Sequence, residues 1–138
     1  MTKWRFLASI MPAKVTILCV DDEPAVLYTT KLILEQAGYD VLTASNAAAG
    51  VSLVAEQAFD VLLLDCVPDR ALLVQEARRR HQGALLLLLT GDMVKTEEAD
   101  LDGVLHKPVP PPELLRTISA WLEKRAPSSG SDWAEKSA

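Results

Sequence analysis

The chain has 138 residues, of which 49% are hydrophobic and 24% are charged, and 14 basic against 19 acidic residues give a net charge of −5. This composition excludes a mainly disordered chain, and the length suits one domain with its own core. Because nucleic-acid-binding domains normally carry a basic face, the acidic balance argues against nucleic acid as a partner. The longest wholly apolar run, residues 84–89, is too short to cross a bilayer, so we expect no membrane partner.

The two ends differ in composition from the middle, which we expect to form a single domain over residues 14–125. Residues 1–13 are a short extension, and its apolar stretch is broken by Ser9, so it does not match an export signal. Residues 126–138 are rich in serine and small residues, which predicts a flexible polar tail. The cysteines, Cys19 and Cys66, form no CxxC pair, which favours a reducing, cytoplasmic location over a disulfide framework.

Between the ends, short apolar runs alternate with segments of helical periodicity. The runs predict buried strands over residues 15–20, 40–44, 61–64, 84–89 and 103–106. Helices are predicted from Pro24 to Gly38, from a cap at Asn46, from a cap at Asp69 to about His81, and over the last amphipathic stretch to about Lys124. Such alternation predicts an α/β fold, with a doubly wound, five-stranded parallel sheet and helices on both faces.

In three of the four predicted helices, residues at helical spacing share one face, which we expect to be the face toward the core. They are Val26, Thr30, Ile33 and Ala37 in the first helix, Ala47, Val51, Val54 and Ala58 in the second, and Leu114, Ile118, Trp121 and Leu122 in the last.

Polar residues stand where the predicted strands end. Asp21 and Asp22 follow the first strand, Asp65 the third, Thr90 the fourth and Lys107 the fifth. Because the carboxyl ends of parallel strands meet at one edge of a sheet, we expect these side chains to lie close together.

Three neighbouring carboxylates raise one another's pKa values, and a hard divalent cation such as Mg²⁺ relieves that repulsion. One carboxylate can then act as a nucleophile toward a phosphoryl group, whose oxygens Lys107 and Thr90 could neutralise.

Four stretches carry a resemblance to a known family: residues 17–24 (ILCVDDEP), 61–65 (VLLLD), 88–91 (LLTG) and 106–108 (HKP). Together they resemble the receiver domain of two-component response regulators, over roughly residues 14–125. The resemblance implies a flavodoxin-like (βα)5 fold. It also implies a signalling module that is not an enzyme beyond its own phosphorylation and dephosphorylation.

The resemblance assigns a role to each strand-end residue. Asp65 would accept a phosphoryl group from a histidine kinase or a phosphotransfer protein. Asp21, Asp22, Asp65 and the backbone carbonyl of Val67 would hold Mg²⁺ or Mn²⁺. Thr90 and Lys107 would bind the phosphoryl group, and the bond before Pro108 would be cis. A downstream protein partner, of unknown identity, would receive the signal.

The sequence also departs from the family pattern. Val104 stands where receivers usually have an aromatic switch residue, and Pro68 comes one place early after the acceptor. Residues 92–102 hold few apolar positions, which predicts a stunted helix. Two alternatives therefore stay open: a binding scaffold that has lost the switch, favoured by Val104, and a magnesium-dependent phosphohydrolase. The hydrolase is disfavoured because such enzymes place a second acid two positions after the nucleophile, where this chain has Val67.

Three further features have ordinary structural explanations. Cys19 is expected to be a buried core thiol. His81 and His106 lack the spacing of metal ligands, so we expect structural or exposed side chains. Arg78, Arg79 and Arg80 would form a solvated face that suits the C-terminal end of a helix.

Overall fold

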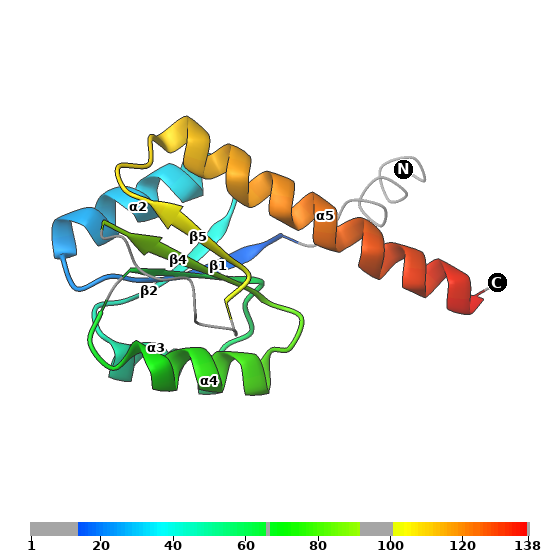
Figure 1. Cartoon of the computed structure of the whole chain (residues 1–138), viewed down its shortest axis with the longest axis horizontal. Coiled ribbons are helices and arrows are strands. Elements are labelled where there is room, and N and C mark those ends of the chain that lie inside the picture. The colour runs from blue at the N-terminus through cyan, green and yellow to red at the C-terminus, as the bar shows by residue number, and fades with distance from the viewer. Residues whose placement is uncertain (1–13, 66, 92–100, 138) are drawn as a thin grey trace, which may run out of the picture.

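A computed structural model describes residues 14–65, 67–91 and 101–137, with side chains as far as Lys124. Its five strands form one sheet in the order β2-β1-β3-β4-β5 (Figure 1). They are β1 (Thr16–Val20), β2 (Asp40–Ala44), β3 (Val61–Asp65), β4 (Leu85–Thr90) and β5 (Gly103–His106). All four neighbouring pairs are parallel, so the predicted doubly wound sheet is confirmed.

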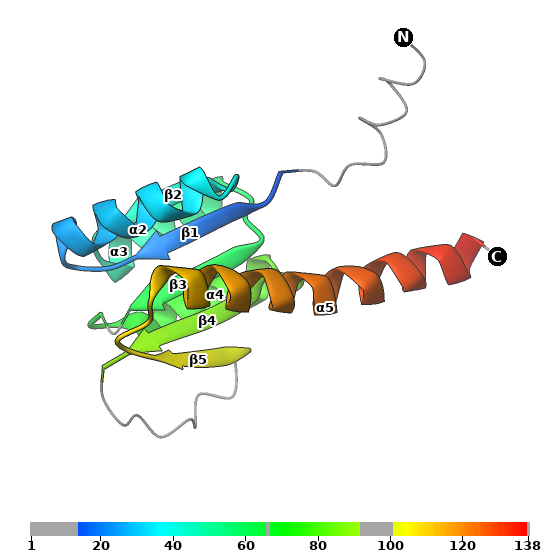
Figure 2. The same cartoon turned by 90° about the horizontal axis from the view of Figure 1, so that it is seen from above.

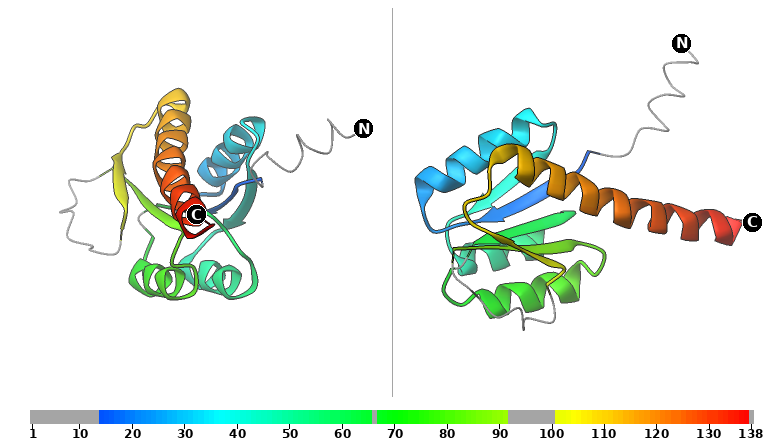
Figure 3. Two further views of the ribbon diagram at one scale, coloured as in Figure 1. Left: turned by 90° about the vertical axis from the view of Figure 1, so that its right-hand side faces the viewer. Right: turned by 45° about the horizontal axis from the view of Figure 1, so that its top comes forward.

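The described helices cover the sheet in pairs (Figures 1 and 3). Helices α2 (Pro24–Gln36) and α5 (Pro111–Ser137) pack on one face, and α3 (Ala47–Glu56) and α4 (Arg70–Arg80) pack on the other. The stunted helix expected over residues 92–102 falls almost entirely outside the described residues.

Alternation along the strands explains why a run of leucines forms β4. Leu86 and Leu88 belong to the core on the α3–α4 face, while Leu85 and Leu87 belong to the core on the α2–α5 face. Strand β3 is likewise buried over residues 61–64. Because both faces are covered, every position of such a strand must be apolar, and the usual polar alternation disappears.

The buried faces of the first two helices differ in part from those predicted. In α2, Leu34 is fully buried and Leu27 packs on the same core, while Val26 and Ala37 are exposed. Helix α3 ends at Glu56, and Ala58 lies beyond it, exposed. The apolar residues of α2 form two overlapping stripes of helical spacing, one that includes Val26 and one that includes Leu27 and Leu34. Packing against the sheet determines that the second stripe faces the core.

The two predicted caps have different outcomes. The Asn46 side chain accepts a hydrogen bond from the Ala49 N–H at 2.7 Å, which confirms its role. Asp69 does precede α4, but its backbone is left-handed, with φ at 62°, and its side chain makes no capping hydrogen bond. The predicted capping role of Asp69 is therefore wrong. A left-handed residue points its side chain away from the first turn, and Asp tolerates this conformation better than most residues.

Helix α5 continues to Ser137, so the predicted end near Lys124 is wrong. Figure 2 shows its second half running past the end of the sheet. The predicted end rested on the last residues of the apolar periodicity, Trp121 and Leu122, and the helical backbone continues beyond them. The flexible character of residues 126–138 stays a prediction. No helix among the described residues has the length and apolar character needed to span a membrane.

Asp102 fixes the start of β5 against its neighbours. Its N–H donates to the Leu86 carbonyl at 2.8 Å, and its Oδ2 accepts from the Leu86 N–H at 2.8 Å. The same Oδ2 lies 2.9 Å from the Arg78 guanidinium, which also donates to the Ala84 carbonyl at 3.2 Å. One carboxylate thus joins the C-terminal end of α4 to the β4–β5 pair.

Strand β5 and helix α5 approach each other closely at Gly103. A Cβ added to this glycine would lie 2.7 Å from two ring atoms of Trp121 and 3.2 Å from the Leu87 side chain. The missing side chain therefore lets the indole lie directly against the strand.

We expect Gly103→Ala to lower the free energy of unfolding by about 1–3 kcal/mol, because the added methyl group overpacks the Trp121 contact. Denaturant melts measure the change. Gly83→Ala is the matched control, because nothing lies within 4 Å of its added Cβ. Equal stability of the two variants would show that the indole moves aside without cost.

Candidate functional site

Three carboxylates converge at the carboxyl edge of the sheet. Asp21 and Asp22 follow β1, and Asp65 is the last residue of β3. One oxygen from each lies within 4.8 Å of the other two. Asp21 is only 7% exposed, Asp22 is exposed, and Asp65 lies between these extremes. The predicted meeting of these residues is confirmed.

Lys107 and Thr90 complete the group. The Lys107 Nζ lies 2.9 Å from Asp65 Oδ1, and its backbone N–H donates to the Thr90 carbonyl at 2.7 Å. Thr90 ends β4 and is fully buried. The Lys107–Pro108 peptide bond is cis, as predicted. Strand ends on β1, β3, β4 and β5 therefore contribute to one site.

Backbone hydrogen bonds hold the acidic pair in place. The Asp21 N–H donates to the Ala44 carbonyl at 3.1 Å, which extends the β1–β2 ladder by one residue. Asp21 Oδ1 accepts from the Glu23 N–H at 2.9 Å, so the chain turns sharply into α2 around this carboxylate. The sequence did not predict this hydrogen bond from the Glu23 N–H, because any residue except proline has a backbone donor and the residue type therefore gives no sign of it.

The charges of the site act on one another. Burial raises the pKa of the Asp21 carboxyl, and the neighbouring Asp65 raises it further, against the opposing effects of the Glu23 N–H and Lys107. For Lys107, partial burial acts to lower the pKa, but the hydrogen bond and charge of Asp65 outweigh it, helped by Asp21 and Glu23. The net effect raises the pKa of Lys107, so the ammonium stays charged beside the acceptor.

The donor set fits a small divalent cation. Carboxylate oxygens from three residues are the hard ligands that Mg²⁺ prefers, and a cation would relieve the repulsion that raises the pKa of Asp21. The Val67 N–H donates to the Asp65 carbonyl at 2.8 Å in a tight turn beside the cluster. The role of the Val67 carbonyl as a further ligand stays a prediction.

A hollow that sequence reasoning missed adjoins the site. Its volume is about 430 Å³, and its lining combines site residues with apolar residues of α2 and α5: Asp21, Val26, Thr30, Leu89, Lys107, Pro108, Val109 and Leu114. The sequence contained one sign of this hollow, the apolar residue Val26. We had placed Val26 on the core-facing side of the first helix, whereas it lines the hollow.

The remaining candidates play structural parts. Burial raises the pKa of the Cys19 thiol to about 12, with a smaller contribution from Asp21, so this core thiol is inert, as expected. Cys66 lies outside the described residues. The His81 Nε2 lies 2.9 Å from the Val54 carbonyl, and the His81 ring is tilted on Phe59, which confirms a structural role.

The three arginines at the end of α4 form ion pairs within the domain. Arg78 pairs with Asp102, while Arg79 and Arg80 both pair with Glu76. The positive charge of the predicted solvated face is thus largely neutralised by Glu76 and Asp102.

Comparison with known proteins identifies the family. The family model of the response regulator receiver domain matches residues 17–119, which is most of the chain, and the chain belongs to this family. It is therefore a receiver domain of two-component signal transduction.

Among its relatives, Protein PilH of Pseudomonas aeruginosa is 34% identical over 116 residues, which cover 77% of this chain and 96% of PilH. A CheY-like receiver domain protein from Methanospirillum hungatei is 31% identical with a TM-score of 0.77, covering 84% of this chain and 99% of that one.

Other relatives are much longer or carry a metal. The chain matches only 13% of the length of the sensor protein GacS from Pseudomonas syringae, at 30% identity over 76% of this chain. The receiver domain of a sensor histidine kinase from Pseudomonas aeruginosa has a TM-score of 0.71 and 26% identity, covering 80% of this chain and 99% of that one. That structure has magnesium coordinated in its active-site cleft.

We expect magnesium to raise the melting temperature. Binding to the folded state alone contributes roughly 1 kcal/mol when the free cation is about five times its Kd. Thermal melts with MgCl₂, against NaCl of equal ionic strength, measure this, and Asp22→Asn should remove the gain without unfolding the chain, because Asp22 is exposed. A gain kept in Asp22→Asn would place the cation elsewhere.

We expect Asp21→Asn to stabilise the metal-free protein at pH 7.5, by roughly 2–5 °C in melting temperature. A raised carboxyl pKa means that the ionised form of Asp21 destabilises the fold at neutral pH, and that this cost fades as pH falls through the raised pKa. Asparagine keeps the oxygen that accepts from Glu23. Melts in EDTA at pH 7.5 and in acid test the sign: the gain should shrink in acid, and an unchanged or lower value at pH 7.5 contradicts the argument.

Proposed function

We propose that Asp65 is the phosphoacceptor of this receiver domain and takes its phosphoryl group from a phosphohistidine of a kinase or phosphotransfer protein. The observation that carries the proposal is the position of the Asp65 carboxylate, which lies between the acidic pair and the Lys107 ammonium. An Asp65 oxygen forms a bond to phosphorus, the P–N bond of the donor breaks, and the imidazole nitrogen keeps the electron pair.

The surrounding residues stabilise the charge that this transfer brings in. Lys107 holds the acceptor carboxylate now and offers its ammonium to the phosphoryl oxygens afterwards. The Thr90 hydroxyl lies at the neighbouring strand end and supplies a hydrogen-bond donor. A magnesium or manganese ion, held by Asp21, Asp22, Asp65 and the Val67 carbonyl, would add positive charge beside the acceptor.

The hollow next to the site supports a protein donor. A second hollow of about 370 Å³ lies beside it, lined by Ala25, Val26, Thr29, Thr30, Ile33, Val109, Pro111 and Leu114. Because Val26 and Thr30 line both, α2 and α5 border a mostly uncharged surface that leads up to Lys107. Such a surface suits the apolar side of a helix on the donor.

The proposal keeps the other expectations drawn from the sequence. The chain acts in the cytoplasm, passes its signal to a further protein, and is not an enzyme toward other substrates. Val67 is buried and apolar two places after Asp65, which supports a receiver over a phosphohydrolase with a second acid there.

We expect one phosphoryl adduct per chain after treatment with acetyl phosphate and Mg²⁺, and none in Asp65→Asn, because only Asp65 has both the acidic pair and Lys107 beside it. Intact-mass spectrometry at short times measures the adduct. Asp40→Asn, which removes an exposed acid at the opposite edge of the sheet, should label like the parent. A labelled Asp65→Asn variant moves the acceptor elsewhere, and an unlabelled parent favours the scaffold.

A further inference from the structure

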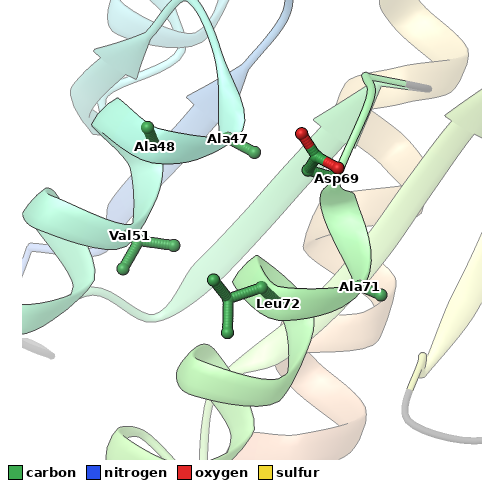
Figure 4. A pocket seen from close by; sticks show the side chains of 6 residues that line it. All are labelled: Ala47, Ala48, Val51, Asp69, Ala71 and Leu72. Carbon is green, nitrogen blue, oxygen red and sulfur yellow. The ribbon is translucent and has the colours of Figure 1, made fainter.

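A third hollow, also apolar, lies on the other side of the sheet, between the first turns of α3 and α4 (Figure 4). Its volume is about 560 Å³, and it is lined by Ala47, Ala48, Val51, Asp69, Ala71 and Leu72. Figure 4 shows the Leu72 and Val51 side chains facing each other across this space, with the Asp69 carboxylate at one end, near Ala47. The hollow shares no lining residue with the hollows beside the phosphoacceptor.

Small side chains account for this shape. On the inner side the helices are tightly packed, since a Cβ added at Gly50 would lie 3.0 Å from the Leu73 side chain. On the outer side, alanines at 47, 48 and 71 leave the gap unfilled, and Leu72 stands at its border with 54% of its surface exposed. A segment that covered the hollow would remove both the Leu72 side chain and the apolar lining from water, which is favourable.

The negative charge of Asp69 at the border of the hollow favours a segment that carries a positive charge. Asp69 is exposed, and the described residues that line the hollow include no lysine or arginine, so a positive charge beside an apolar side chain would be favoured there. The hollow beside the phosphoacceptor differs, because Lys107 lines it and would repel a basic segment.

The chain contains a segment of matching chemistry in residues 1–13. Lys3 and Arg5 alternate with Trp4 and Phe6, Leu7 follows, and these thirteen residues include no acid. This cationic, aromatic composition contrasts with the net charge of −5 of the whole chain.

The length of this segment allows it to reach the hollow. Lys14 precedes β1 at the amino edge of the sheet, and Ala47 begins α3 at the carboxyl edge. Crossing a strand of five residues requires about 17 Å, and the ten residues from Trp4 to Lys14 can span about 33 Å when extended. The remaining length, about 16 Å, is available for the path from the sheet to the outer side of α3 and α4.

We propose that residues 3–7 of the chain dock intramolecularly in the hollow between α3 and α4, with Trp4 or Phe6 against Leu72 and Val51 and with a neighbouring cation beside Asp69. The docked segment would contact α4 at its first turn, and α4 begins five residues beyond Asp65. The proposal does not depend on phosphorylation, so either proposal can fail without the other.

The test uses the full chain with a photoreactive benzophenone amino acid in place of Phe6. Illumination at low protein concentration, followed by digestion and mass spectrometry, locates the residue that it attacks. We expect crosslinks within one chain to residues 47–51 and 69–73. Crosslinks to any other surface, crosslinks only between two chains, or none above background would overturn the proposal.

Matched variants separate docking from folding. Leu72→Gln should abolish most of the crosslink, while Leu32→Gln, an exposed leucine on α2, should leave it unchanged. Asp69→Asn keeps a side chain that tolerates the left-handed backbone and should lower the yield about twofold to fivefold, the range of a surface ion pair. Asp40→Asn should have no effect. Equal yields in Leu72→Gln and Leu32→Gln, both melting like the parent, would reject the hollow as the docking site.

Discussion

Three carboxylates are held together at the edge of a buried sheet, where they repel one another. The other residues of the site offset this repulsion. Burial raises the pKa of Asp21, and the charge of Asp65 raises it further. Two groups offset the cost: the Glu23 N–H, which donates to Asp21, and the Lys107 ammonium, which pairs with Asp65. The neighbouring core supplies the remaining stability, because β1 and β3 are buried along almost their whole length.

A bound cation would relieve that repulsion, whereas a phosphoryl group would add negative charge that the cation and Lys107 would have to offset. In the proposed transfer, Asp65 is already paired with the lysine that would meet the incoming charge, so little needs to move. Function and stability therefore oppose each other at Asp21, where an uncharged substitute would strengthen the fold and weaken metal binding.

The site was predictable because it depends on topology more than on packing. Once the strands are parallel, the residues that end them must meet, and Asp21, Asp65 and Lys107 follow from strand ends alone. Helix rotation is different: Val26 and Leu27 are adjacent and both apolar, and the choice between them depends on the sheet beneath. The capping role of Asp69 failed for a related reason, because a left-handed backbone is set by the turn and is not visible in the residue type. The extent of α5 beyond Leu122 likewise has no pattern of buried residues to mark it.

Asp102 bears on how Lys107 is positioned from the far end of its strand. The register of β5 is fixed at the residue just before the strand, by the paired hydrogen bonds between Asp102 and Leu86 and by the ion pair of Asp102 with Arg78. Strand β5 then leads from this anchor to Lys107, whose ammonium lies 2.9 Å from Asp65. The site therefore depends on a carboxylate at the amino end of β5 as well as on the carboxylates gathered at the carboxyl edge of the sheet.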